Sequence, residues 1–254
     1  MKRAFDHCAG DYARYRPGYP EEVFGVLGTE AGPRAGRFAA DVGAGTGMFS
    51  RGLAACGWQV IAVEPSPAML EHIARPQGHP VGGPPIRLVC ATAEATGLAD
   101  RSVVLVAVAQ AFHWFNPPYA LAELARILQP GGLLALTWNS RDATRSAFVD
   151  AYESLIGRHN PAYRREYRQQ DWAAKIAASG AFEPARYHCF EHVWKLPAEG
   201  LVGFSRSVSY IRNVLSREQV PRFEDELRGL IRQHFGHDDC EIPLQTELWT
   251  ARRR

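Results

Sequence analysis

A glycine-rich loop in the first part of the chain has residue types and spacing suited to binding a nucleotide-containing ligand. Residues 41–47 read Asp-Val-Gly-Ala-Gly-Thr-Gly, and Glu64 follows a second apolar run. Glycines permit a tight turn and let a ligand approach the backbone, and a helix that begins there presents free N–H groups. A carboxylate such as Glu64 can accept hydrogen bonds from both ribose hydroxyls. Together these features indicate ligand binding rather than a purely structural turn.

Two cofactor classes compete for this loop. A dinucleotide fingerprint is G-x-G-x-x-G/A, in which the third small residue lets the helix pack closely on its strand. Met48 occupies that position here, and the loop instead reads G-x-G-x-G behind Asp41. The loop therefore departs from the dinucleotide pattern.

Short apolar runs that alternate with helical patterns position the loop. This alternation is typical of a parallel sheet with crossover helices, in which ligands bind beyond the carboxyl ends of the strands. The glycine loop ends the first strand. Ser66 with Pro67 marks the start of a helix, in which Met69, Leu70 and Ile73 are expected to face inward. The predicted strands cover residues 37–42, 58–63, 86–90, 102–109 and 133–138.

The second half of the chain has a different character. Residues 143–180 and 198–236 have mostly helical patterns rich in Arg, Tyr and Trp, whereas 186–194 and 243–250 resemble strands. We therefore expect a single α/β domain over residues 1–254. Its parts are an N-terminal lid (1–30), a ligand-binding core (31–140) and a helical cap with the last strands (141–254).

The composition limits the partners and the compartment. The chain has 254 residues, of which 46% are apolar and 22% charged, as in ordinary globular proteins. A net charge of +2 does not indicate a nucleic-acid-binding face. Five scattered cysteines argue against a disulfide framework or zinc site and favour the cytoplasm. No apolar run has the length of a membrane span, so we expect no membrane partner. The nine histidines are dispersed, so we expect no metal site.

At these residues the chain resembles a known family. The 41–47 loop with Glu64 looks like motif I and the ribose-binding acid of class I S-adenosylmethionine (SAM)-dependent methyltransferases. Further stretches resemble the type 11 branch, and within it trans-aconitate-methyltransferase-like proteins. They are DYARYRPGYP (11–20), ATAEATGLADRSV (91–103), AQAFHWF (109–115), ELARILQPGG (123–132) and TWN (137–139). The resemblance is strong over roughly residues 5–140.

The resemblance implies a Rossmann-like, doubly wound, mostly parallel seven-stranded sheet with an antiparallel last strand, and SAM as methyl donor. Related enzymes often carry an Asp where this chain has Thr92, and another where it has Val104. The replacement at Thr92 is expected to leave a weaker contact with the adenine amino group or one made by the backbone. The replacement at Val104 is expected to be structural rather than catalytic. By position, the implied cofactor residues are Asp41, Gly43, Ala44, Gly45, Gly47 and Glu64, with Thr92, Ala93 and Glu94 bordering the adenine.

Tyr12 and Arg16 precede Pro17 and Pro20 near the start of the chain. By residue type alone this segment is a surface strap with solvated charges. The resemblance favours a lid over SAM, because an arginine can make a two-point contact with the amino-acid carboxylate. An aromatic face such as that of Tyr12 can cover the cofactor and exclude water.

Gln110, His113 and Trp114 follow the fourth predicted strand, beside the expected sulfonium. A cation is stabilised near aromatic faces; we assign Gln110 to the cofactor and Trp114 to the acceptor. His113 is a candidate general base for an acceptor that must lose a proton. The alternative is a packed, hydrogen-bonded histidine, since methyl transfer to a carboxylate needs no base.

The segment SRSVSY (205–210) resembles, by position, the substrate-facing helix of the family. Arg206 and Tyr210 are therefore candidate acceptor contacts, and an arginine there suits a carboxylate-bearing acceptor. By residue type alone, most Arg and Tyr residues in the cap are exposed helix residues.

The stretch Asn116-Pro117-Pro118-Tyr119 has two interpretations. NPPY is the signature of enzymes that methylate amino groups, in which its Asn ends the fourth strand. Here HWF intervenes, and Asn116 stands where a helix needs an N-cap, followed by Pro117 at the first helical position. Inward-facing leucines up to Leu128 set the helix phase, and QPGG (129–132) is expected to end the helix. We favour the capping interpretation.

The leading hypothesis is a cytoplasmic SAM-dependent methyltransferase that acts on a carboxylate or hydroxyl of a small molecule, as a monomer or homodimer. One alternative is an amino-group methyltransferase of nucleic acid or protein that uses NPPY. Another is a non-catalytic SAM-binding regulator.

Overall fold

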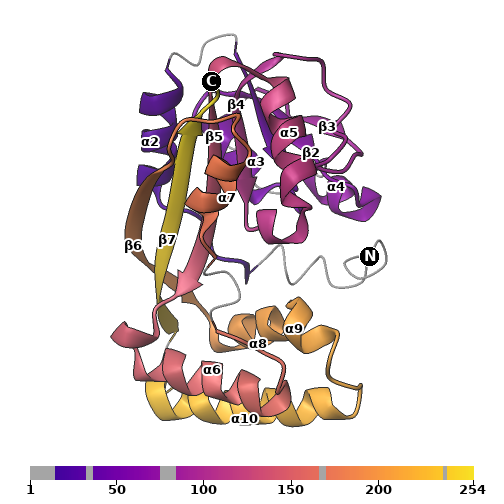
Figure 1. Cartoon of the computed structure of the whole chain (residues 1–254). Helices are drawn as coiled ribbons and strands as arrows, with labels where there is room; N and C mark the ends of the chain where they lie inside the picture. Colours follow the sequence, from indigo (N-terminus) through magenta and orange to yellow (C-terminus); the bar gives the residue numbers. More distant parts are fainter. Residues whose placement is uncertain (1–14, 33–36, 75–83, 166–169, 237–238) are drawn as a thin grey trace. The chain divides into compact units, whose positions relative to one another are not determined.

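The computed structural model describes residues 15–32, 37–74, 84–165, 170–236 and 239–254 (Figure 1). Its main feature is a seven-stranded sheet in the order β3-β2-β1-β4-β5-β7-β6. This order confirms the predicted doubly wound, Rossmann-like sheet. The strands are β1 (Phe38–Val42), β2 (Gln59–Val63), β3 (Arg87–Val89), β4 (Val103–Ala109), β5 (Leu128–Arg141), β6 (Arg186–Leu196) and β7 (Cys240–Arg252).

The first five strands run parallel. β1 pairs with β2 and β4, β2 pairs with β3, and β4 pairs with β5. The strand order reverses between β1 and β4, so the carboxyl ends of these two strands form the switch point at which α/β sheets bind ligands. Residues Val103–Val108 of β4 are all buried, as expected for a strand covered on both faces.

The last strand runs against its neighbours. Gly131 of β5 contacts Arg253 just beyond β7, and Thr137 contacts Glu247, so residue numbers rise on one strand as they fall on the other. This is the pattern of an antiparallel pair. β6 runs antiparallel to β7 in the same way. The predicted antiparallel insertion of the last strand is confirmed.

Helices cover both faces of the central strands. On one face α2 (Glu21–Ala31) and α3 (Met48–Ala55) pack with strand residues such as Ala39 and Leu105. On the other face α5 (Pro117–Ile127) and α7 (Trp172–Ala178) pack with Ala40 and Val106. Neighbouring residues of a strand point to opposite faces, so apolar strands serve two hydrophobic cores at once.

A further helix, α4 (Pro67–Ala74), begins where the sequence predicts. The Oγ atom of Ser66 accepts the backbone N–H of Met69 at 3.4 Å, which satisfies one of the free donors of the first turn. This helix follows β2 and Glu64, so its cap fixes the chain direction directly after the predicted ribose-binding residue.

The chain divides into two compact units. Within the described ranges, we call residues 19–139, 170–190 and 246–254 the core unit, and residues 15–18, 140–165 and 191–245 the helical unit. The helical unit contains α6 (Ala147–His159), α8 (Ala198–Ser207), α9 (Ser209–Arg212) and α10 (Gln219–Phe235). It has its own hydrophobic core, in which Phe148, Leu155, Leu201, Phe223 and Leu227 take part.

Two details differ from the sequence-based expectation. The α5 helix ends at Ile127, whereas Leu128 and the QPGG stretch belong to β5. Leu128 is extended, with φ −69° and ψ 143°, because it pairs with Val103 of β4. Sheet pairing therefore overrides the helical spacing of the leucines. Leu70 of α4, which we expected to face inward, is only half-buried.

Candidate cofactor and acceptor site

The glycine loop leaves β1 at the switch point of the sheet. The N–H groups of Gly43 and Ala44 donate to the carbonyl of Val63 at 2.8 and 3.1 Å, which ties the loop to the end of β2. Gly43, Gly45 and Gly47 all have positive φ, a conformation that favours glycine. The glycine spacing therefore fixes the shape of the loop before any ligand binds.

The three glycines differ in their surroundings. A Cβ atom at Gly43 would lie 2.7 Å from the Cβ of Ala111, and one at Gly47 would lie 2.7 Å from Cγ1 of Ile73. At these two positions the protein itself requires glycine. A Cβ atom at Gly45 would meet no heavy atom of the described chain within 4 Å. Gly45 is therefore the loop glycine whose open side suits a ligand.

Glu64 closes the loop from the end of β2. Its Oε2 accepts the N–H of Gly45 at 3.0 Å, and its Oε1 accepts the N–H of Ser66 at 3.1 Å. Each carboxylate oxygen can accept more than one hydrogen bond, so both keep capacity for ligand hydroxyls. Burial raises the pKa of Glu64 above its ordinary value, and the N–H groups of Gly45 and Ser66 oppose the rise. Ligand hydroxyls would add donors that favour the charged form.

Asp41, directly ahead of the loop, is fully buried. Its Oδ2 accepts the hydroxyl of Ser50 at 2.5 Å, which links the end of β1 to α3. This contact supports the loop from beneath. A direct contact of Asp41 with the cofactor stays a prediction.

The segment from Thr92 to Glu94 lies in a tight turn after β3. The N–H of Ala95 donates to the carbonyl of Thr92 at 3.3 Å, and Ala93 is buried. Oε1 of Glu94 accepts the N–H of Asn116 at 2.9 Å. Glu94 therefore braces the start of α5, and the adenine contacts of this segment stay predictions.

Gln110 follows β4 in a strained conformation. Its φ is +58°, a left-handed value that costs a non-glycine residue about 1–2 kcal/mol. Its N–H donates to Thr137 at 2.8 Å, and its Nε2 donates to the carbonyl of Asn139 at 3.2 Å. Within the described residues, the buried Oε1 of Gln110 has no hydrogen-bond partner. Strained residues cluster at ligand sites, and an unsatisfied acceptor suits a ligand donor.

His113 lies in the short turn η1 (Phe112–Trp114) that follows β4. The indole N–H of Trp138 points at Nδ1 of His113 across 3.3 Å. An indole nitrogen can only donate, so Nδ1 is the acceptor and the neutral imidazole carries its proton on Nε2. The basic nitrogen is thus engaged by Trp138, and the other nitrogen presents an N–H. This geometry favours a packed, hydrogen-bond-donating histidine over a general base.

Aromatic packing holds Trp138 in place. Trp138 is fully buried and stacks on Trp172 with ring centroids 4.5 Å apart, and Trp249 meets it edge-on at 5.5 Å. Trp114, in contrast, is 49% exposed, and its ring centroid lies 4.9 Å from that of His113. Trp114 therefore offers apolar surface beside His113.

Asn116 to Tyr119 begins α5 and does not end β4, because η1 lies between them. Asn116 is the N-cap with φ −84° and ψ 105°, and Pro117 and Pro118 take the first helical positions. The predicted N-cap position is confirmed. The prediction of a capping hydrogen bond is wrong, since the Asn116 side chain makes none. A cap normally accepts from the second or third helical residue, and Pro118 has no N–H to offer.

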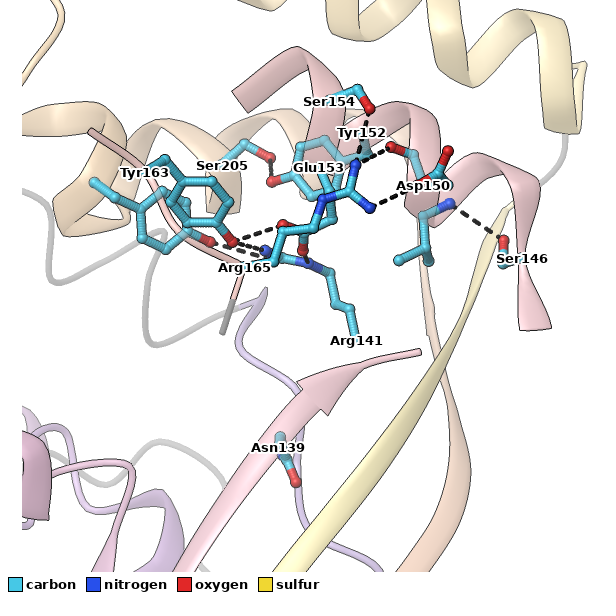
Figure 2. A network of polar contacts seen from close by, with 12 residues as sticks. Asn139, Arg141, Ser146, Asp150, Tyr152, Glu153, Ser154, Tyr163, Arg165 and Ser205 are labelled. Carbon is cyan, nitrogen blue, oxygen red and sulfur yellow. Dashed lines mark hydrogen bonds and ion pairs between the residues drawn. The ribbon is translucent and has the colours of Figure 1, made fainter. Parts of the chain in front are cut away.

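In the helical unit, a buried ion pair joins Arg141 at the end of β5 to Glu153 of α6 (Figure 2). Nε of Arg141 lies 2.6 Å from Oε1 of Glu153, and the two side chains are only 13% and 8% exposed. The guanidinium also donates to the hydroxyls of Tyr210 and Tyr163, both at 3.1 Å. The Tyr163 hydroxyl in turn donates to Oε2 of Glu153 at 2.7 Å.

The charges in this network balance each other. Burial opposes the charged form of Arg141, but Tyr210 and Glu153 together raise the pKa of the guanidinium well above its ordinary value. Arg141 therefore stays charged and satisfied inside the helical unit. We interpret the network as a brace between β5, α6 and α9.

The predicted acceptor segment is divided between two helices. Arg206 lies in the last turn of α8 and pairs with Glu224 at 3.5 Å, with 47% of its side chain exposed. Tyr210 lies in α9 and takes part in the Arg141 network. Arg16 is half-buried in the helical unit, and Tyr12 lies outside the described residues.

Sequence reasoning missed three contributors to these sites: Trp138 behind His113, Ser50 beneath Asp41, and the Arg141–Glu153 pair. Each contact joins residues whose proximity depends on strand order or helix packing, which local periodicity does not reveal. The one available signal was Trp138 itself, because a buried indole N–H needs an acceptor.

No group of three or more His, Cys, Asp or Glu residues in the described ranges is arranged to hold a metal ion. No described helix is both long and apolar enough to cross a bilayer.

Comparisons with known proteins agree with this geometry. A family model described as "Methyltransferase domain" matches residues 40–136, which include the glycine loop, Glu64 and η1. An uncharacterized methyltransferase of Mycobacterium tuberculosis is 35% identical over 237 residues, or 92% of this chain and 88% of its own. A methyltransferase-like protein of Schizosaccharomyces pombe is 29% identical over 99% of this chain and 96% of its own.

Solved structures agree as well. A proposed type II methyltransferase from Anaeromyxobacter dehalogenans is similar with a TM-score of 0.68 and 26% identity, over 94% of this chain and 98% of that one. The sheet order, the glycine loop joined to Glu64, and the relatives along nearly the whole chain all lead to one family. The chain belongs to the methyltransferase domain family, and it is a class I, SAM-dependent methyltransferase.

Proposed function

We propose that the protein transfers a methyl group from SAM to a carboxylate oxygen of a small-molecule acceptor, with a hydroxyl oxygen as the second candidate. The hydrogen bond from Trp138 to His113 carries this proposal. A hydroxyl acceptor must lose a proton to a base, whereas a carboxylate reacts as it is. Because Nδ1 of His113 is already an acceptor, a reaction that needs no base is favoured.

SAM supplies a methyl group that is already activated in a sulfonium, so the residues of this chain bind, orient and exclude water. We assign the ribose hydroxyls to Glu64, because the N–H of Gly45 holds its carboxylate at the glycine loop. The orphaned Oε1 of Gln110 suits the ammonium group of the cofactor. The remaining assigned cofactor residues are Asp41, Gly43, Ala44 and Gly47 in the loop, and Thr92, Ala93 and Glu94 near the adenine.

The acceptor contacts are assigned from residue chemistry. Trp114 offers exposed aromatic surface, and Arg206 and Tyr210 offer a cation and a hydroxyl that suit a carboxylate. Tyr12 and Arg16 are assigned to a lid over the cofactor. We also propose that the protein belongs to the trans-aconitate-methyltransferase-like branch, is located in the cytoplasm and acts as a monomer or homodimer.

Amino-group methylation through Asn116-Pro117-Pro118-Tyr119 is less well supported. Asn116 is the N-cap of α5, and η1 separates it from the end of β4. A non-catalytic SAM-binding regulator would keep the same cofactor residues, so turnover decides between the two.

The test is turnover of radiolabelled SAM with a panel of di- and tricarboxylic acids, phenols, duplex DNA and unfolded protein. We expect label to be incorporated into the acids alone. Mild alkali should release this label as methanol, because it hydrolyses methyl esters but not methyl ethers. Label only in phenols, DNA or protein would overturn the proposal. Calorimetric binding of SAM without turnover on any acceptor would favour the regulator.

A further inference from the structure

A groove of about 880 Å³ lies between α5 and α7 in the core unit. It shares no lining residue with the glycine loop, Glu64 or η1. Its walls include the small side chains of Ala122 and Ala125 on α5 and Ala178 on α7. The approach distance of two packed helices depends on the side chains at the contact, so these alanines leave room for another element to approach closely.

The polar lining of the groove is cationic. Lys175, Arg253 and Arg254 line it, and no Asp or Glu of the described chain does. Nζ of Lys175 lies 5.3 Å over the ring of Trp172, and the two arginines donate to backbone carbonyls. None of the three has a carboxylate partner among the described residues. A fourth cation, Arg126, is already paired with Glu123 and Asp100.

Aromatic surface adjoins this groove. Tyr119 is 67% exposed and lies one turn before Ala122 and two turns before Arg126, on the same side of α5. Pro118 next to it lines the groove. Exposed tyrosine beside arginine is the composition that dominates binding energy at protein interfaces.

We propose that this groove docks an amphipathic helix of a partner protein whose polar face is acidic. The apolar face would cover the alanines, and the carboxylates would lie beside Lys175, Arg253 and Arg254, as in helix-in-groove recognition. The lining residues of α5 run from Pro117 to Arg126, about 14 Å at 1.5 Å per residue. That length matches two to three turns of a partner helix, whereas a free phosphate would leave the apolar walls uncovered.

The first test is fluorescence anisotropy with a labelled helical peptide of about 18 residues, long enough to fold alone, with leucine on one face and glutamate on the other. The control peptide carries lysine in place of glutamate. We expect the acidic peptide alone to bind, and its affinity to fall as salt screens the charges. No binding of the acidic peptide at about 1 mM, or equal binding of both peptides, would overturn the proposal.

The second test maps the binding to the groove. Lys175→Glu with Arg254→Glu changes the net charge by as much as Arg217→Glu with Arg232→Glu, two exposed cations outside the groove. We expect the first pair to weaken binding about tenfold or more and the second less than about twofold. Equal losses would assign the effect to net charge and refute the docking site.

Two further measurements keep the result interpretable. Thermal unfolding and SAM binding of both double variants show whether each one is folded. Hydrogen exchange should show protection of α5 and α7 when the acidic peptide binds. Binding to phosphatidylglycerol vesicles that depends on Lys175 and Arg254, without peptide binding, would replace the protein partner by a lipid surface and overturn the proposal.

Discussion

The indole N–H of Trp138 donates to Nδ1 of His113 across 3.3 Å, and this contact decides which imidazole nitrogen carries the proton. Trp138 is fully buried between other aromatic rings, so the donor has little freedom to turn away. The side chain that looks most like a base in the sequence is therefore held as a donor, through Nε2–H.

Replacing Trp138 by Phe removes the donor and should release this constraint. Long-range ¹H–¹⁵N NMR correlations should show the Nε2–H tautomer of His113 in the wild type and a mixture of tautomers in the variant. A wild-type His113 protonated on Nδ1 would contradict the geometry. His113→Asn provides the control, because it removes the assigned imidazole signals.

Turnover gives a separate check on the role of His113. His113→Gln keeps an N–H donor but has no basic nitrogen, whereas His113→Ala has neither. We expect the Gln variant to retain clearly more kcat than the Ala variant. Removing a general base typically costs about 10²–10⁴-fold. Equal losses of that size in both variants, with SAM binding intact, would show that His113 acts as a general base.

Glu64→Gln should weaken SAM binding by about 10–150-fold, because hydrogen bonds to charged groups contribute about 1.5–3 kcal/mol. Calorimetry measures the dissociation constant directly. Glu22→Gln on the exposed start of α2 is the matched control and should bind like the wild type. An unchanged affinity of the Glu64 variant would remove Glu64 from the cofactor site.

The raised pKa of Glu64 also predicts a pH dependence of stability in the absence of SAM. Burial raises the pKa of this carboxyl above its ordinary value of 4.5, so the folded state holds the proton more tightly than the unfolded state. Glu64 therefore destabilises the fold progressively as pH rises from about 4.5 through the folded pKa. Relative to Glu64→Gln, the wild type should lose stability in urea unfolding as pH rises above the ordinary pKa of 4.5. A difference that stays constant, or grows in the wild type's favour, would contradict this.

Alanine at two glycines of the loop should have different effects. Gly43→Ala places a Cβ 2.7 Å from Ala111, and overpacking of this kind costs about 1–3 kcal/mol in addition to the positive φ. Gly45→Ala meets open space and should cost only the left-handed strain of about 1–2 kcal/mol. We expect Gly43→Ala to lower the free energy of unfolding more, and Gly45→Ala to lose SAM affinity while losing only the smaller amount of stability that the strain costs. The reverse order would contradict the assignment of the open side of Gly45 to the ligand.

The sequence predicted the parts of the site that depend on local pattern and parallel pairing. β1 and β2 were visible as apolar runs, and since parallel neighbours end at one edge of a sheet, Gly45 and Glu64 had to come close. Leu128 shows where local pattern fails. It lies at helical spacing from the leucines of α5, but it pairs with Val103 of β4 and therefore belongs to β5. The hydrogen bond from Trp138 to His113 could not be predicted either, since the two residues come together only through the pairing of β4 and β5.

The Arg141–Glu153 pair offers a test of the brace in the helical unit. Glu153→Leu leaves a buried guanidinium without its carboxylate, which typically costs about 3–5 kcal/mol. Replacing both charged residues and one of the tyrosines, with Arg141→Met, Glu153→Leu and Tyr163→Phe, should recover most of that loss, because the buried ion pair is then gone. Urea unfolding measures both variants. A triple variant as unstable as the single one would mean that the network contributes more than charge balance.

Asn116 is the N-cap of α5, but its side chain makes no capping hydrogen bond. Ser146 at the start of α6 does, since its Oγ accepts the N–H of Val149 at 3.3 Å. Asn116→Ala should therefore change the free energy of unfolding by less than about 0.5 kcal/mol, whereas Ser146→Ala should cost about 1 kcal/mol. Turnover of Asn116→Ala should match the wild type, because Glu94 binds the backbone N–H of residue 116, which the substitution keeps. A large loss of kcat in this variant, at unchanged stability and SAM affinity, would show that the asparagine amide takes part in methyl transfer and would return NPPY to the active site.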